Sequence, residues 1–237
     1  MGRYQTAFNN DIFYMVTNKH ETYYDYKFKD GINTIPGEFN CDETSIGISR
    51  GFCFTTKDNI YKFINNGIFI REIFLPFRDP NFKMIVDITG DKFRSNKVIL
   101  STRHKIENTQ TITKLYLNEY PNELCNWAIQ YNRIPVLELL KNANYDFNRN
   151  REIISLISIY GHLNILIWFY RNGFHFDSQS IDNAIILSHV NKNFRIIDWL
   201  NDNFNELYIN SMYVDPFDKY NKLYNFIDIS IKRDILY

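Results

Sequence analysis

Four apolar segments recur at a nearly constant spacing in the second half of the chain. They are VLELL (136–140), ILIWF (165–169), IIDWL (196–200) and FIDIS (226–230), at offsets of 29, 31 and 30 residues. A period of about 30 residues, with apolar side chains at helical spacing, predicts stacked helix pairs, because one such unit cannot bury its apolar face alone. Stacks of this kind usually present an extended surface for binding other macromolecules.

The recurrence predicts a helical part over residues 116–237. It divides into units near 121–148, 150–177 and 178–206, each with two helix candidates joined by a short turn. After them, an apolar ladder at i, i+4 spacing predicts an amphipathic helix that caps the stack, because a terminal unit must cover the last apolar face. The ladder consists of Leu223, Ile227, Ile231 and Ile235.

Residues 1–115 have a different pattern, in which short runs of β-branched and aromatic residues alternate with turn clusters. This pattern predicts strands in a compact α+β domain with a mainly antiparallel sheet. The strand candidates are 12–16, 23–28, 46–55, 68–76, 83–88 and 96–100. Between two of them, KDNIYKFINNG (57–67) predicts a short helix that stops at Gly67.

Composition indicates a folded intracellular protein. The 27 basic and 27 acidic residues give a net charge of zero, so no overall field would draw the chain to nucleic acid or to an anionic membrane. Three cysteines without a CxxC pair (Cys41, Cys53 and Cys125) indicate free thiols in a reducing compartment. No apolar run is long enough for a signal or a membrane span. The start MGRYQT fits a myristoylation pattern, but no polybasic second signal follows.

The segment YGHLNILIWFYRNG (160–173) resembles an ankyrin repeat, with Gly-His-Leu between its two helices and a glycine after the second. The neighbouring units lack the Gly-His pair, and the ankyrin TPLH turn is absent throughout. The resemblance therefore implies a short, degenerate ankyrin-like solenoid.

The first half extends this resemblance. The segments 14–33, 51–67, 71–76 and 90–100, in this order, are similar to the N-terminal domain that precedes ankyrin-like repeats in a large protein family of giant viruses of the mimivirus type. The resemblance covers nearly the whole chain. It implies an α+β domain followed by an ankyrin-like helical solenoid, a viral protein of the host cytoplasm, and a protein partner.

Our leading hypothesis is non-enzymatic protein–protein recognition. In ankyrin-like stacks the loops between units and the surface of the first helices form the binding side. That resemblance assigns partner binding to Tyr145, Arg149, Arg171, His175 and Asp177, with Asn126, Gln130 and Ser158 behind them. The partner's identity and the oligomeric state are left open.

Two aromatic or imidazole positions invite a functional reading but favour a structural one. In the ankyrin pattern, a histidine at the place of His162 starts the second helix and bonds neighbouring backbone. Trp168 and Trp199 occupy one repeat position, which is Leu139 in the first unit. A position that alternates between Leu and Trp indicates core packing between helices.

The alternative hypothesis is a nucleic-acid-binding module that uses the basic segment 92–105. Clustered Lys92, Arg94, Lys97 and Arg103 could contact phosphates, and Phe93 could stack on a base. The same alternation is also typical of the solvated face of an edge strand.

Other classes are disfavoured. The cysteines and His20, His104 and His175 lack metal-ligand spacing, so we expect neither a metal nor a cofactor. His20, Glu21 and Tyr23 could serve a transferase, yet adjacent strand residues face opposite sides. With no GxSxG element, we do not expect an enzyme. A third possibility, an adaptor of the poxvirus ankyrin type, lacks a clear F-box-like segment.

Overall fold

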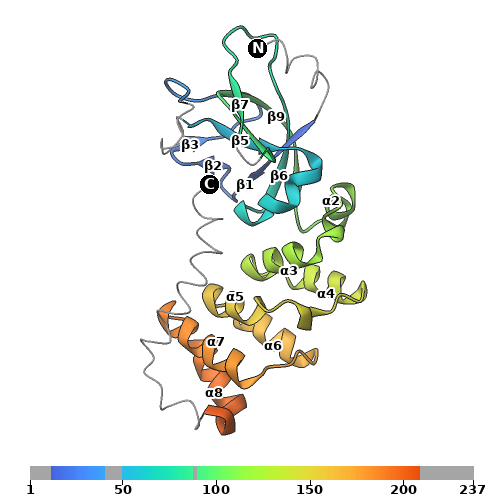
Figure 1. Cartoon of the computed structure of the whole chain (residues 1–237), viewed down its shortest axis with the longest axis vertical. Helices are drawn as coiled ribbons and strands as arrows, with labels where there is room; N and C mark the ends of the chain where they lie inside the picture. The colour runs from blue at the N-terminus through green and yellow to red at the C-terminus, as the bar shows by residue number, and fades with distance from the viewer. Residues whose placement is uncertain (1–11, 41–49, 88–89, 209–237) are drawn as a thin grey trace. The chain divides into compact units, whose positions relative to one another are not determined.

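The computed structural model describes residues 12–40, 50–87 and 90–208, with side chains described up to residue 204 (Figure 1). The chain divides into two compact units, Met1–Tyr120 and Pro121–Tyr237. The first contains an antiparallel sheet and the described part of the second consists of helices, so the fold class is α+β, as predicted.

The first unit is built on a seven-stranded sheet in the order β4-β9-β6-β1-β5-β8-β7. Every pairing in it is antiparallel. Its strands are β1 (Phe13–Thr17), β4 (Gly31–Thr34), β5 (Phe52–Thr55), β6 (Phe69–Phe74), β7 (Met84–Val86), β8 (Lys92–Ser95) and β9 (Lys97–Lys105). The strand candidates 12–16, 68–76, 83–88, 96–100 and the described part of 46–55 correspond to strands of this sheet, and β4 and β8 are two additional ones.

Aromatic residues at alternating strand positions form the core of this unit. Phe13, Phe54 and Phe93 come from β1, β5 and β8, and their ring centroids lie 5.3–5.6 Å apart. All three are at most 6% exposed. Since side chains on a strand alternate between faces, burying Phe52 and Phe54 directs Cys53 to the opposite face.

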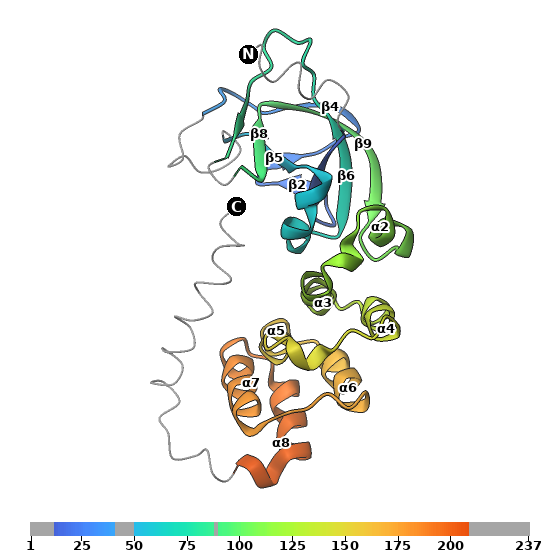
Figure 2. The ribbon, with the colours of Figure 1, turned by 45° about the vertical axis from the view of Figure 1, so that its right-hand side comes forward.

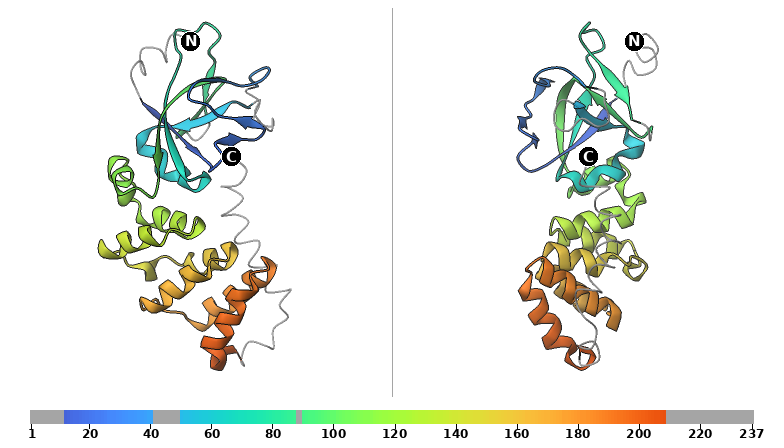
Figure 3. Two further views of the ribbon diagram at one scale, coloured as in Figure 1. Left: turned by 180° about the vertical axis from the view of Figure 1, so that it is seen from behind. Right: turned by 60° about the vertical axis from the view of Figure 1, so that its left-hand side comes forward.

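The segment predicted as one strand over 23–28 is instead a two-stranded hairpin, β2 (Thr22–Tyr23) and β3 (Tyr26–Lys27). Tyr24 adopts a left-handed backbone conformation with φ of 49°, which reverses the chain. Figure 3 shows the hairpin in blue beside the larger sheet. The prediction failed because aromatic alternation indicates strands without locating the turn between them.

The predicted helix over 57–67 is present as a 3₁₀ helix, η2 (Lys57–Asn66), with Ile60 and Ile64 buried. Gly67 ends it, but not through a left-handed cap, because its φ is 179°. A Cβ atom on Gly67 would lie 2.1 Å from the carbonyl oxygen of Thr17. Glycine is needed here because the backbone approaches β1 closely.

The helical segment after β9 was not predicted from the sequence. Helix α2 (Thr109–Lys114) begins where the Asn108 side chain accepts a hydrogen bond from the Gln110 amide at 2.9 Å. A short 3₁₀ turn, η3 (Leu117–Glu119), follows. The signal was present, because Asn is a favoured N-cap residue.

In the second unit, the helices form three consecutive pairs within the described residues. They are α3 (Pro121–Gln130) with α4 (Ile134–Asn142), α5 (Ile153–Tyr160) with α6 (Leu163–Arg171), and α7 (Ser178–Val190) with α8 (Phe194–Tyr208); η4 (Phe147–Arg149) lies between the first two pairs. The first helices contact one another from pair to pair, α3 with α5 and α5 with α7 (Figure 2).

The turns repeat with the helices. Asn132, Gly161 and Lys192 end the first helix of each pair with φ of 56°, 74° and 58°. Asn144 and Gly173 hold the same left-handed conformation after the second helix of the first two pairs. The recurrence found in the sequence thus corresponds to recurring backbone geometry. The predicted fourth segment (226–230) and the capping ladder lie outside the described residues.

Candidate functional site

Equivalent hydrogen bonds join neighbouring helix pairs in the second unit. The His162 imidazole donates from Nε2 to the carbonyl oxygen of Gln130 at 3.1 Å. One pair later, the Asn193 amide donates to the carbonyl oxygens of Ser158 and Ile159 at 2.8 and 3.0 Å. His162 and Asn193 are equivalent in the repeat, as are Gln130 and Ile159. The structural role predicted for His162 is confirmed, and Asn193 performs it in the third pair.

Gly161 lies at one of these joints, by which we mean the hydrogen-bonded contacts between neighbouring helix pairs, and glycine suits the position in two ways. Its φ of 74° is strained for residues with a side chain, and a Cβ atom there would meet the Asn193 carboxamide oxygen at 2.4 Å. Glycine therefore permits the turn and leaves space for the link from the next pair.

Four of the predicted partner-binding residues are exposed at the ends of the second helices and in the following loops: Arg149, Arg171, His175 and Asp177. The loop that contains Arg149 and the loop that contains His175 lie next to each other, because the Asn148 side chain accepts a hydrogen bond from the His175 amide at 3.3 Å. Arg149 pairs with Asp146 at 3.2 Å, but 84% of its side chain stays exposed.

Two of the predicted contact residues also stabilise the loops. The Tyr145 hydroxyl donates to the Asn122 side chain, and burial raises the pKa of Tyr145 to about 12. Asp177 caps α7 by accepting a hydrogen bond from the Ser180 amide at 2.7 Å, which lowers the pKa of its carboxyl group. Replacing either residue would therefore disturb loop structure as well as a contact.

The expectation that Ser158 lies behind the binding surface as a contact residue is wrong. Ser158 is fully buried, and its hydroxyl donates to the carbonyl oxygen of Ile154 at 2.8 Å. A small polar residue on an apolar helix can bond its own backbone, and the sequence does not reveal this choice.

Asn126 and Gln130 are half-buried and join the first pair to the second. The Asn126 amide donates to Glu152 and accepts from Asn150, both at 2.8 Å. Gln130 offers its backbone carbonyl to His162. These residues join the two helix pairs from which the exposed loops extend.

Trp168 packs between helices, as predicted. It is 8% exposed, its ring contacts Phe147 and Phe169, and its indole N–H donates to Glu138 of the preceding pair. Trp199, at the equivalent position, is half-buried against Tyr170, with ring centroids 5.2 Å apart.

The loops between pairs are anchored by aromatic rings, which the sequence analysis did not single out. Phe147 contacts Phe169, Phe169 contacts Phe174, and Phe174 contacts Phe176, with centroids 5.2–5.3 Å apart. The available signal was a phenylalanine five residues after the end of each second helix, Phe147 after α4 and Phe176 after α6. The rings hold the loop backbone while charged neighbours face solvent.

The basic segment of the first unit is not an exposed patch. Lys92 and Arg94 are 8% and 3% exposed, and β8 lies between β5 and β7, so its interpretation as a solvated edge strand is wrong. Lys92 pairs with Asp87 at 3.1 Å, and Lys97 pairs with Asp79. These cations contact carboxylates of the same chain, which leaves them unsuited to phosphate backbones.

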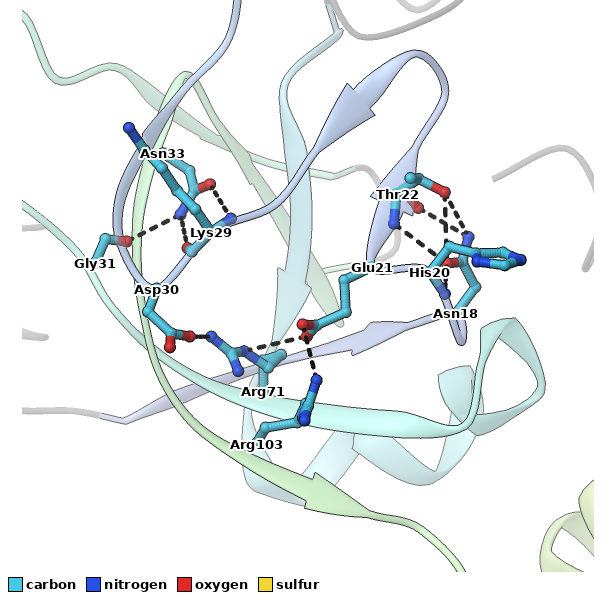
Figure 4. A network of polar contacts seen from close by, with 10 residues as sticks. All are labelled: Asn18, His20, Glu21, Thr22, Lys29, Asp30, Gly31, Asn33, Arg71 and Arg103. Carbon is cyan, nitrogen blue, oxygen red and sulfur yellow. Dashed lines mark hydrogen bonds and ion pairs between the residues drawn. The ribbon is translucent and has the colours of Figure 1, made fainter.

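Arg103, the fourth cation of that alternative, belongs to a different network (Figure 4). Its guanidinium donates to Glu21 at 3.2 Å and lies over the Phe69 ring. Glu21 also lies 3.5 Å from the buried Arg71, which bonds Asp30 on its other side. The two arginines face each other across β6 and β9, so Glu21 lies between like charges. The network fastens residues 18–33 to the sheet, and Glu21 has a structural role in it.

A second buried carboxylate joins α2 to the sheet. Glu72 accepts from His104 at 2.9 Å and from Lys114 at 2.5 Å, close to Tyr14. Burial by itself would raise the pKa of Glu72, but the two hydrogen bonds lower it below its ordinary value. Glu72 therefore stays ionised at neutral pH and acts as a structural counter-ion.

The described residues contain no group of three or more His, Cys, Asp or Glu side chains arranged to hold a metal ion. Of the helices in the part of the chain that the structure describes, none has the length and apolar character needed to cross a membrane.

Comparison with known proteins supports the architecture described above. A "Putative ankyrin repeat protein" of Acanthamoeba polyphaga mimivirus is 28% identical over 160 residues, which is 65% of this chain and 80% of the relative. The chain is similar to mimivirus ankyrin repeat proteins. Another protein of that name from the same virus is 28% identical over 145 residues, 59% of this chain but 24% of the relative. The chain thus spans most of one relative and about a quarter of another.

The mimivirus resemblance predicted from the sequence is therefore confirmed. An uncharacterized protein of the same virus matches as well, with 28% identity over 100 residues, 42% of this chain and 72% of the relative. No family model and no solved structure matches the chain.

Proposed function

We propose that this chain is a non-enzymatic protein-interaction module that binds a protein partner through the loop surface of its helical unit. The observation that carries the proposal is that some polar side chains of that unit join the helix pairs while others face solvent. His162, Asn193 and Asn126 join the pairs, whereas Arg149 and His175 face solvent from adjacent loops. The ankyrin repeat names of the relatives agree with such a role.

The proposal includes the organisation of the chain. An α+β domain over 1–115 precedes degenerate ankyrin-like units near 121–148, 150–177 and 178–206, closed by a C-terminal capping helix. The backbone turns at Asn132, Gly161 and Lys192 support three such units. Because the relatives are viral proteins, the proposed location is the host cytoplasm.

The proposed binding surface is centred on Arg149, Arg171 and His175. Tyr145 and Asp177 contribute contacts in addition to their structural bonds, and Asn126 and Gln130 lie at the rim. Ser158 is omitted because it is buried. Burial of Lys92 and Arg94 counts against the nucleic-acid alternative.

Affinity capture followed by mass spectrometry, from infected or expressing cells, tests this function. The bait is the full chain, compared with a variant carrying Arg149→Ala, Arg171→Ala and His175→Ala. These side chains make few internal contacts, so the variant should keep its thermal stability while losing the partner. The matched control, Arg195→Ala with Asp198→Ala on the exposed side of α8, should capture it normally. Equal capture by all three proteins would refute the assignment.

A further inference from the structure

Arg94 in β8 is buried without a hydrogen-bond acceptor for two of its nitrogens. Its exposed fraction is 3%, and among the described residues nothing accepts a hydrogen bond from Nε or Nη1. The Asp87 carboxylate oxygen Oδ2 lies 3.9 Å from Nε, which is too far for a hydrogen bond. A buried guanidinium in this state is strongly unfavourable unless an anion or a water completes its contacts.

A second buried cation lies next to the same carboxylate as Arg94. Lys92, two residues earlier on the same strand face, is 8% exposed and lies 3.1 Å from the same Asp87 oxygen. The Asp87 carboxylate therefore lies beside both cations. Arg50 is a third cation, close enough to act on the Tyr23 hydroxyl that contacts Cys53, and its Nε is likewise buried with no acceptor among the described residues.

Two neighbouring titratable groups, Cys53 and Tyr23, do not supply a negative charge. Cys53 lies opposite Arg94 in the β5–β8 ladder, and its sulfur is 3.7 Å from the Tyr23 hydroxyl. Burial raises the pKa of the Cys53 thiol and of the Tyr23 hydroxyl. Both groups are therefore neutral at physiological pH, although Lys92 and Arg94 act on Cys53, and Arg50 acts on Tyr23.

We propose that a small inorganic oxyanion of the phosphate type binds between Arg94, Lys92 and Arg50. An oxyanion presents several acceptor oxygens, so one ion can accept hydrogen bonds from both Arg94 nitrogens that lack an acceptor among the described residues. Because Arg94 and Lys92 are buried, the site suits a small free ion. The phosphates of a nucleic acid are too bulky to reach these side chains. The site belongs to the first unit and is independent of the proposed partner surface.

Thermal unfolding of the full chain in phosphate, against chloride at equal ionic strength and pH, tests this site. A ligand present at about 100 times its Kd should raise the midpoint of a protein of this size by roughly 5–10 °C. We expect such a rise for the natural sequence and its loss in Arg94→Gln. The matched control is Lys97→Gln, which removes a cation paired with Asp79 on the next strand and should retain the rise.

Two further measurements keep the test decisive if Arg94→Gln does not fold. Asp87→Asn removes the competing carboxylate and should lower the Kd for phosphate several-fold in isothermal titration calorimetry. Arg94→Lys keeps the charge but loses the fork of donors, and should raise that Kd. Equal midpoints of the natural sequence in phosphate and chloride would overturn the site. So would a phosphate effect that is the same in the natural sequence, Arg94→Lys and Asp87→Asn.

Discussion

At the scale of single residues, the joints between helix pairs depend on one side chain each. His162→Ala should leave the Gln130 carbonyl without its side-chain donor, and Asn193→Ala should do the same to Ser158 and Ile159. We expect each change to destabilise the second unit by about 1–2 kcal/mol in urea unfolding. His189→Ala on the exposed end of α7 serves as control and should cost about 0.5 kcal/mol or less. A loss at His162 no larger than at His189 would contradict the role of this joint.

Glu21 offers a second residue-scale test, in the first unit. It lies between Arg71 and Arg103, and Arg71 is only 4% exposed. Glu21→Gln leaves two arginines facing each other with less negative charge, so we expect a loss of about 2–4 kcal/mol in stability. Chemical denaturation measures it, and Lys19→Gln on the exposed turn is the control. If both variants unfold at the same denaturant concentration, the network that fastens residues 18–33 to the sheet contributes nothing to the stability of the first unit.

At the scale of elements, Gly67 fixes how closely η2 approaches β1. Gly67→Ala would place Cβ 2.1 Å from the Thr17 carbonyl oxygen, so the backbone must move. We expect a loss of about 3 kcal/mol or more, the range of severe overpacking. Gly31→Ala is the comparison, because its φ of 80° is strained but open space surrounds it; about 1 kcal/mol is expected there. Equal midpoints in thermal unfolding for the two variants would argue against a steric role for Gly67.

The elements also show what the sequence could predict. The helices of the second unit were found because their apolar residues recur at helical spacing, and the left-handed turn at Gly161 was visible as a glycine. A short turn was predicted in each unit, but the left-handed conformation at Lys192 was not, since lysine seldom adopts φ above zero without tertiary contacts that impose it. The burial of Lys92 and Arg94 was missed for a similar reason. Alternation places them on one face, but only the neighbouring strands and Asp87 decide whether that face meets water.

The candidate site was predicted in part. Its exposed cations and the structural role of His162 follow from the ankyrin pattern. The burial of Ser158 does not, because one hydroxyl on an apolar helix gives no sign of its direction. The role of Asn193 could be found only by aligning it with His162 through the repeat offset.

At the scale of the whole molecule, the groups whose pKa is shifted in the folded state predict a plateau of stability near neutral pH. The folded-state pKa values of Glu72, Asp79 and Asp177 are lowered, so their contribution is present above the unfolded values near 4 and is lost as pH falls below them. Cys125 has the opposite shift, because burial raises the pKa of its thiol well above the ordinary value. Its contribution is complete below pH 9 and declines above it, since the unfolded thiol ionises while the buried one cannot.

Urea unfolding from about pH 3 to 10 should therefore show a plateau at roughly pH 5–8 with a decline on each side. Two variants distinguish the decline at acid pH (the acid arm) from the decline at alkaline pH (the alkaline arm). Glu72→Gln should flatten part of the acid decline, because it removes a carboxylate that must be ionised to accept from His104 and Lys114. Cys125→Ala should flatten part of the alkaline decline and leave the acid arm unchanged. An alkaline arm that is the same with and without Cys125 would show that this buried thiol does not govern stability at high pH.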